Sequence, residues 1–373
     1  SAAPQPIASI NELYLHHDFL PWLNVLAGKK RLLWGAGLAY NPTDLLNPAK
    51  DPTDPTFQRA GAWMVRVEAP FERYTFTLLA TPAVVKQRSG LPQALLAYPS
   101  WDKQDDELHY LVAARAYALL FDADLNLMLL HSNLYSDGFQ DKTRLGFSFS
   151  RYFFTDYELH VEALVGAGSA RAYGSPQCLQ SQEAATDCLA RGEPLFPRKR
   201  LDEGRLRPRV LVGTRYMFSD ESLLSVEYLY QADGLKRHEL QDYVNGLSLL
   251  RLAEQLGVDT DAPGAADAGL PQKFTFEPLT RHYAFISFQK PKIREDFTFS
   301  AVLVASLQDF SGLIAPSLAW STTEWLTLTV SAFLPLPGPS SRAVTVPGST
   351  RTVSEFNLLP LKYRGLFQAR LFY

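Results

Sequence analysis

The sequence lacks any run of about 18 uncharged apolar residues, the length that a transmembrane helix requires. Its mean hydropathy of −0.11 is also below that of a helical membrane protein. Neither absence excludes a membrane, because barrel strands alternate lipid-facing and lumen-facing residues and average to near neutrality. No shift in composition divides the 373 residues, so we expect a single domain over 1–373.

Signatures of catalysis and cofactor binding are missing as well. No glycine-rich phosphate loop follows a predicted strand, and neither a Gly-x-Ser-x-Gly elbow nor a Cys-x-x-Cys-His haem motif occurs. His16 and His17 are adjacent, so in a strand they point to opposite faces and are poorly placed to share a metal ion. The net charge of −3 gives no reason to expect nucleic acid. We therefore predict no enzyme activity, no cofactor and no metal.

Cysteine is scarce: the chain has 2, Cys178 and Cys188, within a polar segment rich in proline and glycine. No other zinc ligands cluster around them. We predict a loop disulfide formed in an oxidising compartment, with two free thiols as the alternative.

The C-terminal segment shows an unbroken period of two, the pattern of a strand with one apolar and one polar face. One parity carries Leu359, Leu361, Tyr363, Gly365, Phe367, Ala369, Leu371 and Tyr373, and the other carries Lys362, Arg364, Leu366, Gln368, Arg370 and Phe372. The terminal Tyr373, with Leu371, Ala369 and Phe367 behind it, resembles the C-terminal signal of bacterial outer-membrane barrels. That resemblance implies recognition by the barrel-assembly machinery.

The same alternation recurs along the whole chain in segments of the length that a tilted membrane strand needs. We predict about fifteen strands, near 8–16, 22–37, 61–69, 73–82, 107–119, 123–131, 143–152, 156–166, 208–218, 222–230, 281–289, 295–307, 313–321, 324–335 and 355–373. Short and long connections alternate between them, except for the short link near 308–312. The long connections include 38–60, 83–106, 167–207 and 231–280.

This layout predicts a transmembrane antiparallel up-and-down β-barrel of about 16 strands, within roughly 14–18, with short periplasmic turns and long extracellular loops. A soluble sandwich or lipocalin-like barrel is disfavoured, since so many apolar faces would have to pair within one core. Bacterial barrels have even strand numbers. We therefore expect either that a strand precedes Ser1 in the native protein or that one strand was missed or merged. The chain shows no signal peptide at Ser1, and we expect one to have been removed or to lie upstream.

Charged side chains of mixed sign are expected on the lumen-facing parity, where they would set the field felt by a solute. They are Arg66, Glu68, Arg115, Glu158, His160, Glu162, Arg215, Glu227, Lys362, Arg364 and Arg370. Internal salt bridges that close the lumen are the alternative. Glu158, His160 and Glu162 share one strand face, where they would either bind a cation or act in acid–base chemistry, or simply form a polar wall, the interpretation that we favour.

Loop 231–280 contains apolar residues at helical spacing, among them Leu240, Tyr243 and Leu247. A helix there would either constrict the lumen or cap the barrel from outside. In loop 38–60, Pro42, Pro48, Pro52 and Pro55 favour a stiff, extended segment, which we expect at the pore mouth.

Residues 27–37 read AGKKRLLWGAG and are followed by Asn41-Pro42-x-Asp44 and Asn47-Pro48. This segment resembles outer-membrane porin and exporter barrels of the alginate-export-like group, in which Gly-Arg-Gln and Trp-Gly lead into Asn-Pro-x-Asp. Here Lys29 and Lys30 stand where that pattern has Arg and Gln. The resemblance implies diffusion or export of a polar, anionic solute or polymer.

Three functions follow as hypotheses. The first is a channel or export conduit in the bacterial outer membrane, in contact with its lipids and lipopolysaccharide. The second is a structural barrel that anchors periplasmic or envelope partner proteins. The third, an outer-membrane enzyme such as a lipase, has no specific support in the sequence.

Overall fold

The computed structural model describes residues 12–32, 34–44, 46, 61–82, 110–132, 142–169, 175, 177–179, 181–191, 193, 201–240, 242–243, 278–338, 342–346, 349–358 and 364–371. None of the helices in these residues is both long and apolar enough to cross a membrane.

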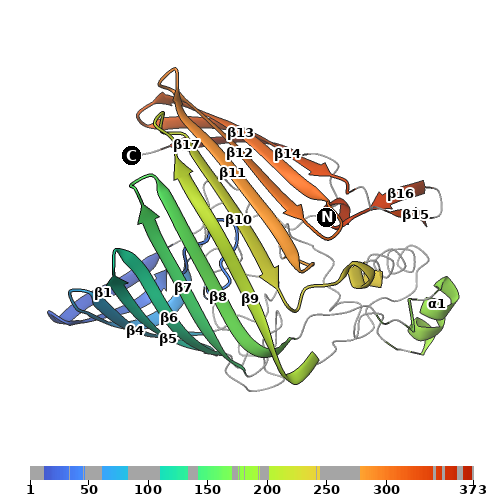
Figure 1. Ribbon diagram of the computed structural model, residues 1–373, viewed down its shortest axis with the longest axis horizontal. Coiled ribbons are helices and arrows are strands. Elements are labelled where there is room, and N and C mark those ends of the chain that lie inside the picture. The colour runs from blue at the N-terminus through green and yellow to red at the C-terminus, as the bar shows by residue number, and fades with distance from the viewer. Residues whose placement is uncertain are drawn as a thin grey trace.

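In the described residues, fifteen strands form one antiparallel sheet in which the strands follow in chain order, with β14 paired directly to β17 (Figure 1). They are β1 (Leu13–Leu20), β2 (Leu23–Lys30), β3 (Ala62–Pro70), β4 (Tyr74–Pro82), β5 (Tyr110–Leu120), β6 (Ala123–Ser132), β7 (Lys142–Phe153), β8 (Tyr157–Ser169), β9 (Leu201–Met217), β10 (Leu223–Gln231), β11 (His282–Ile293), β12 (Phe297–Ser306), β13 (Gly312–Thr323), β14 (Leu326–Leu336) and β17 (Arg364–Leu371). The predicted all-β, up-and-down arrangement is confirmed.

Smaller elements lie in the long connections. Helix α1 (Gln182–Ala190) follows β8, and the hairpin β15 (Arg342–Val346) and β16 (Ser349–Val353) follows β14. The 3-10 helix η2 (Glu355–Leu358) comes next. Within loop 231–280, residues 237–240 and 242–243 are helical, as the spacing predicted. Leu247 and the predicted loop 83–106 lie outside the described residues.

Several predicted strand boundaries were wrong. The first two strands are 13–20 and 23–30, joined at Pro21-Trp22, because Leu13, Leu15 and Phe19 continue the alternation past the predicted turn. The second strand does not reach residue 37, since the chain turns inward after Lys30. The predicted loop 167–207 is shorter, as β8 continues to Ser169 and β9 begins at Leu201.

The C-terminal strand is also shorter than predicted. Residues 355–358 form η2 because the Glu355 side chain is buried in hydrogen bonds with Leu279 and Thr280, which precede β11, and with Tyr283 of β11, and these bonds take this stretch out of the sheet. Residues 359–363, which include Lys362, and residues 372–373, which include Tyr373, lie outside the described part. Phe367 and Ala369 pair with outward residues of β14, and Phe367 is 66% exposed.

The described sheet has two edge strands, β1 and β17. Because fifteen antiparallel strands follow in chain order, these two edges run in the same direction. An antiparallel closure therefore cannot form directly between them, and the predicted total of 16 strands is not confirmed.

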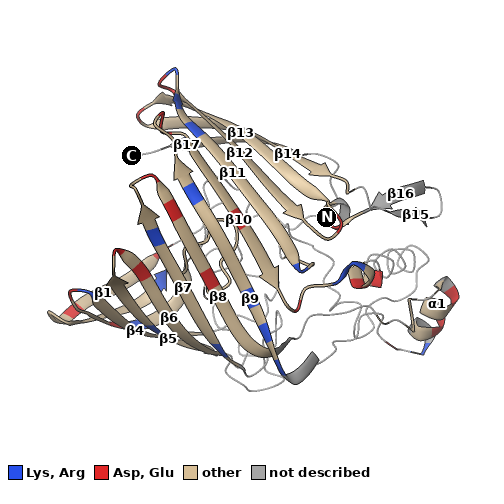
Figure 2. Ribbon diagram, in the orientation of Figure 1, with Lys and Arg blue, Asp and Glu red and all other residues tan. Residues whose placement is uncertain are grey.

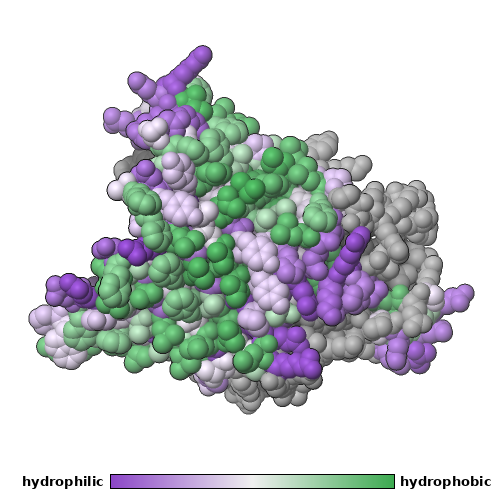
Figure 3. All heavy atoms as spheres, viewed as in Figure 1, coloured by the Kyte–Doolittle hydropathy of each residue, from purple (hydrophilic) through white to green (hydrophobic). Residues whose placement is uncertain are grey.

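The two faces of the sheet differ in chemistry, as strand alternation dictates. The outer face exposes large apolar side chains in mid-strand, such as Leu78 (62% exposed), Leu129 and Val330. Figure 3 shows this apolar surface spread over the strands, with the hydrophilic residues gathered mainly toward their ends. An exposed apolar surface of this extent is typical of contact with lipid.

The inner face carries buried side chains in two apolar clusters. One gathers residues of β2 to β8, and the other gathers residues of β9 to β14 together with Phe356. Residues after β2 join both: Leu32, Trp34 and Leu46 pack in the first cluster, and Ala39 packs in the second. We call residues 34–44 and 46 the inner segment, because they lie against the inner face of strands far from β2.

Candidate functional site

Two glutamates on neighbouring strands hold the inner segment. Glu162 of β8 is fully buried and accepts four hydrogen bonds from it. The donors are the backbone N–H of Gly37 (2.6 Å), the side-chain amide of Asn41 (3.0 Å), and the backbone N–H (3.3 Å) and hydroxyl (2.8 Å) of Thr43. A carboxylate that satisfies so many donors fixes the position of this backbone.

Glu227 of β10 extends this contact. Its two oxygens accept hydrogen bonds from the backbone N–H groups of Leu38 (2.5 Å) and Ala39 (2.9 Å). The two carboxylates therefore bind consecutive backbone amides at 37, 38 and 39, and they anchor one end of the loop after β2 to the wall formed by β8 and β10.

A row made of a histidine and charged side chains continues from Glu227 along the inner face. His160, fully buried on β8, lies 3.0 Å from Glu227 through Nε2 and 3.5 Å from Glu158 through Nδ1. Glu158 in turn lies 3.0 Å from Arg215 of β9. In Figure 2 acidic and basic bands alternate across β8 and β9. Each charge in this buried row has an opposite or hydrogen-bonding neighbour, as burial requires.

Glycines make the close approach between the inner segment and the side chains of β8 possible. Gly35 has a φ of +93°, and a Cβ there would lie 2.4 Å from Oε1 of Glu162. Gly213 of β9 leaves room for His160, since a Cβ would lie 2.2 Å from its Nε2. A glycine is therefore required on the segment and another on the wall that receives it.

A tight turn shapes the end of the inner segment. The backbone N–H of Asp44 donates to the carbonyl of Asn41 at 3.1 Å, which places Pro42 at the second position of a four-residue turn, where proline is favoured. The side-chain amide of Asn41 also donates to the carbonyl of Gly37 at 2.8 Å. The predicted extended segment at the mouth is thus wrong for these residues, which fold against the wall instead.

The start of the inner segment contacts the charged side of the sheet. The Arg115 guanidinium lies over the ring of Trp34 at 5.8 Å, and its Nε donates to Asn126 of β6 at 2.7 Å. On β3, Arg66 and Glu68 approach to 3.7 Å, and Glu68 accepts a hydrogen bond from Thr77. Trp34 is 2% exposed, so it is fixed between this wall and the apolar cluster.

The predicted lumen residues fall into three groups. Glu158, His160, Glu162, Arg215 and Glu227 come together on β8 to β10 beside residues 37–43, whereas Arg66, Glu68 and Arg115 lie on the same face at β3 and β5, where Arg115 contacts Trp34. Arg370 pairs with Thr327 of β14, on the inner parity. Arg364 is part of β17, and Lys362 lies outside the described residues.

The wall formed by β12 to β14 is different, since its inner parity carries hydroxyl groups rather than charges. Ser300 and Ser317 hydrogen-bond to each other at 2.6 Å, and Ser331 continues the row on β14. The inner face thus carries charges between β3 and β10, whereas on β12 to β14 it is uncharged, with hydroxyls in this row and apolar residues of the second cluster beyond it.

A second group of buried hydrogen bonds, centred on Glu355, joins η2 to the start of β11 and to the turn between β12 and β13. Glu355 accepts hydrogen bonds from the Tyr283 hydroxyl, the Thr280 hydroxyl (3.0 Å) and the Leu279 N–H (3.1 Å). Its own N–H donates to Asp309 at 2.8 Å. Burial raises the pKa of the Glu355 carboxyl, and these donors oppose that shift. These hydrogen bonds fix the position of the connection between β14 and β17.

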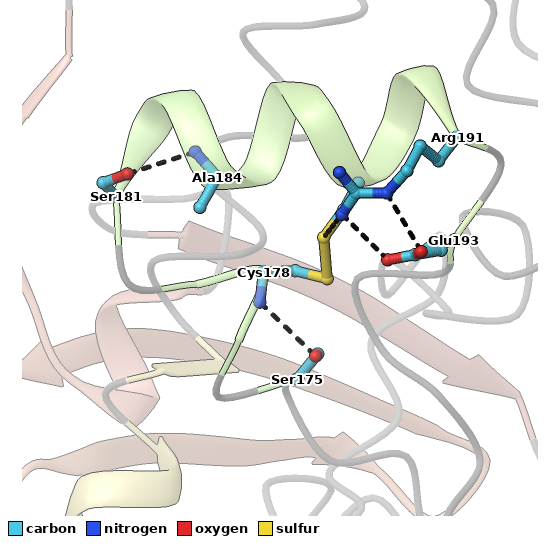
Figure 4. The surroundings of a disulfide bond; sticks show 7 residues. Ser175, Cys178, Ser181, Ala184, Arg191 and Glu193 are labelled. Carbon is cyan, nitrogen blue, oxygen red and sulfur yellow. Dashed lines mark hydrogen bonds and ion pairs between the residues drawn. A yellow bond between two sulfur atoms is a disulfide. The ribbon is translucent and has the colours of Figure 1, made fainter.

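The predicted disulfide between Cys178 and Cys188 is present, with its Cα atoms 5.8 Å apart (Figure 4). Ser181 caps helix α1 by accepting the N–H of Ala184 at 3.1 Å, and Arg191 pairs with Glu193 at 3.0 Å. Among the described residues, the two sulfurs and Glu193 are the one group near enough to share a metal ion. Because the sulfurs are bonded to each other, they are not thiolate ligands.

Replacing both cysteines with serine is expected to loosen only the connection between β8 and β9. The chain-entropy contribution of such a short loop is about 3 kcal/mol and applies to that loop, not to the sheet. Limited proteolysis should cut the variant faster after residue 170, while the unfolding midpoint stays unchanged. A lowered midpoint would show that the loop supports the sheet.

The sequence predicted the two wall carboxylates but not their partners. Gly37, Leu38, Ala39 and Thr43 offer mainly backbone amides, which no sequence pattern distinguishes. The available signal was the pair Gly35 and Gly37 next to the Asn-Pro-x-Asp turn, a combination that permits close backbone approach to another group.

Comparisons with known proteins give similarity of fold only. No family model and no curated protein matches the chain, so the resemblance to the alginate-export-like group is not confirmed. The chain is similar to a loop L8 deletion mutant of OmpT, an outer membrane protein of Vibrio cholerae (8% identity, 86% of this chain and 82% of that chain, TM-score 0.39). It is also similar to OccK8 (OprE) of Pseudomonas aeruginosa (10%, 85% and 74%, 0.43) and to OprB of Pseudomonas putida (11%, 88% and 68%, 0.37).

Proposed function

We propose that this chain is an outer-membrane channel for polar solutes and that the inner segment is its constriction. The observation that carries the proposal is the anchoring of residues 37–43 by Glu162 and Glu227 across the polar inner face. A loop that folds inward and binds the opposite wall narrows the path along the inner face. Charged groups on one side of that path and hydroxyls on the other suit a hydrated solute.

The outer face supports a membrane location for this channel. Its apolar side chains would be unstable in water over such an area, whereas lipid and lipopolysaccharide would cover them. The outward apolar residues Phe367 and Ala369 near the chain end fit the proposed contact with the barrel-assembly machinery. We propose no catalytic role, because Glu158, His160 and Glu162 are buried and bound to protein groups.

Purified protein reconstituted into a planar bilayer tests the channel directly. We expect stable single-channel conductance in the full chain, with a step size that changes little when residues 244–277 are removed. The absence of conductance in both proteins would refute the channel. A matched sample unfolded in detergent controls for leakage caused by detergent alone.

A structural barrel that anchors envelope proteins is the second candidate. The apolar packing of Trp34, Ala39 and Leu46 favours it, because it resembles the core of a permanently closed barrel. Co-purification of a partner in constant ratio, together with a silent bilayer, would support this candidate over the channel.

A further inference from the structure

We infer that Arg144, Arg207 and Arg209 form an anion-binding site at the end of the sheet that bears the long loops. Its ligand class is a small solute with a phosphate or carboxylate group. The inference deepens the proposed function, since this site would be the first strongly charged group that a solute meets before the inner segment.

The sheet register gathers these arginines on the inner face. Gly166 of β8 pairs with Arg144 of β7 on one side and with Arg207 of β9 on the other. Arg209 pairs with Leu164, two residues closer to Glu162. Because alternate residues of a strand share a face, all three arginines point to the same side as Glu162. Figure 2 shows basic bands on the corresponding ends of β7 and β9.

Gly166 lets the side chains converge. A Cβ at this position would lie 2.9 Å from Cγ of Arg144 and 3.6 Å from its Cδ and Nε. The Arg144 side chain therefore lies over the space that a larger residue on β8 would fill. Strands β7 and β9 are about 10 Å apart, a distance that two arginine side chains bridge from opposite sides.

Among the described residues, the charges near these arginines favour an anion. Asp233 is bound to Arg209, with 2.9 Å between its Oδ2 and Nη2. Arg144 is 7% exposed, and it interacts electrostatically with both Arg209 and Asp233. In the described part of the chain, the buried Nε of Arg207 has no hydrogen-bond partner. A buried donor without an acceptor is unfavourable, and an anion that binds Arg207 would remove that cost.

Guanidinium groups define the ligand chemistry. Each presents a planar fork that binds two oxygens of a phosphate or carboxylate, which a lysine does not match. The centre of the site at Gly166 is about 13 Å from Glu162, because the two residues are four positions apart along β8. An anion bound to the arginines would therefore remain clear of the acidic groups that hold the inner segment.

Calorimetric titration of the full chain in detergent with tripolyphosphate tests the site. We expect saturable binding, with affinity at least tenfold lower in Arg207→Gln and partly restored in Arg207→Lys. Arg294→Gln is the matched control, since Arg294 is an exposed arginine in the short turn between β11 and β12, at the opposite end of the strands, and the affinity of this variant should equal that of the wild type. Equal affinity in Arg207→Gln and the wild type, or no binding to the wild type, would overturn the inference.

Bilayer recordings separate this inference from the channel proposal. Tripolyphosphate added from one side should reduce the current through the wild type and have little effect on Arg207→Gln. Binding in the calorimeter with no conductance would reject the channel and keep the anion site. Conductance with no tripolyphosphate binding would reject the anion site and keep the channel.

Discussion

Replacing Glu162 with alanine is expected to raise the single-channel conductance several-fold and to make it fluctuate. The substitution removes the acceptor for the N–H of Gly37 and for both polar groups of Thr43. Those donors would then be buried without partners. The free-energy difference that favours the anchored position of the inner segment over a released position would therefore be smaller. Single-channel recording of the variant in a planar bilayer measures the result.

The size of the effect follows from the hydrogen bonds involved. A hydrogen bond to a charged group contributes about 1.5–3 kcal/mol, although the four at Glu162 are not additive. A loss of about 3 kcal/mol would shift the ratio of anchored to released segment by roughly two orders of magnitude. Glu227 still holds Leu38 and Ala39, so we expect switching between states rather than permanent release.

Glu68→Ala is the matched control. Glu68 is also a carboxylate on the inner face, but it contacts Arg66 of β3 and Thr77 of β4 and not the backbone of the inner segment. We expect its conductance to show the wild-type step size without added fluctuation. If Glu162→Ala and Glu68→Ala behave alike, the inner segment is not the constriction.

The strands could be predicted from the sequence because their signal is local. A period of two with apolar residues on one parity, as in Leu326, Leu328 and Val330, indicates a strand whatever its partners are. The order of strands then followed from the short turns alone. The strand ends could not be predicted as well, because the first strand continues through the charged residue Asp18, a position that favours a turn by its polarity.

The candidate site could be predicted only in part, because it depends on long-range contacts. Glu162 and Gly37 are 125 positions apart, and Glu227 and Leu38 are 189 apart. Parity alone placed both glutamates on the inner face, yet nothing local to them indicates backbone amides as partners. The same limit explains η2: the alternation of Leu359 and Leu361 suggested a strand, while the buried contacts of Glu355 with Tyr283 and Thr280 prevail.

Replacing Gly213 with alanine is expected to destabilise the folded protein by about 1–3 kcal/mol, the usual cost of an overfilled interior. The new Cβ would lie 2.2 Å from Nε2 of His160 and 2.8 Å from Cγ of Glu227. His160 has little freedom to move, since a carboxylate lies near each ring nitrogen. Urea unfolding in lipid vesicles, followed by tryptophan fluorescence, should show a lower midpoint than the wild type.

Gly365→Ala is the control for glycine replacement itself. Gly365 lies on β17, and a Cβ there would meet no atom within 4 Å. Alanine in a strand is more stabilising than glycine by about 0.5–1 kcal/mol, so this variant should be as stable as the wild type or slightly more stable.

Gly213→Ala should also raise the conductance, because displacement of His160 and Glu227 disturbs the acceptors of Leu38 and Ala39. A midpoint equal to that of Gly365→Ala would mean that the His160 row shifts freely, and the rigid wall argued for the inner segment would then be wrong.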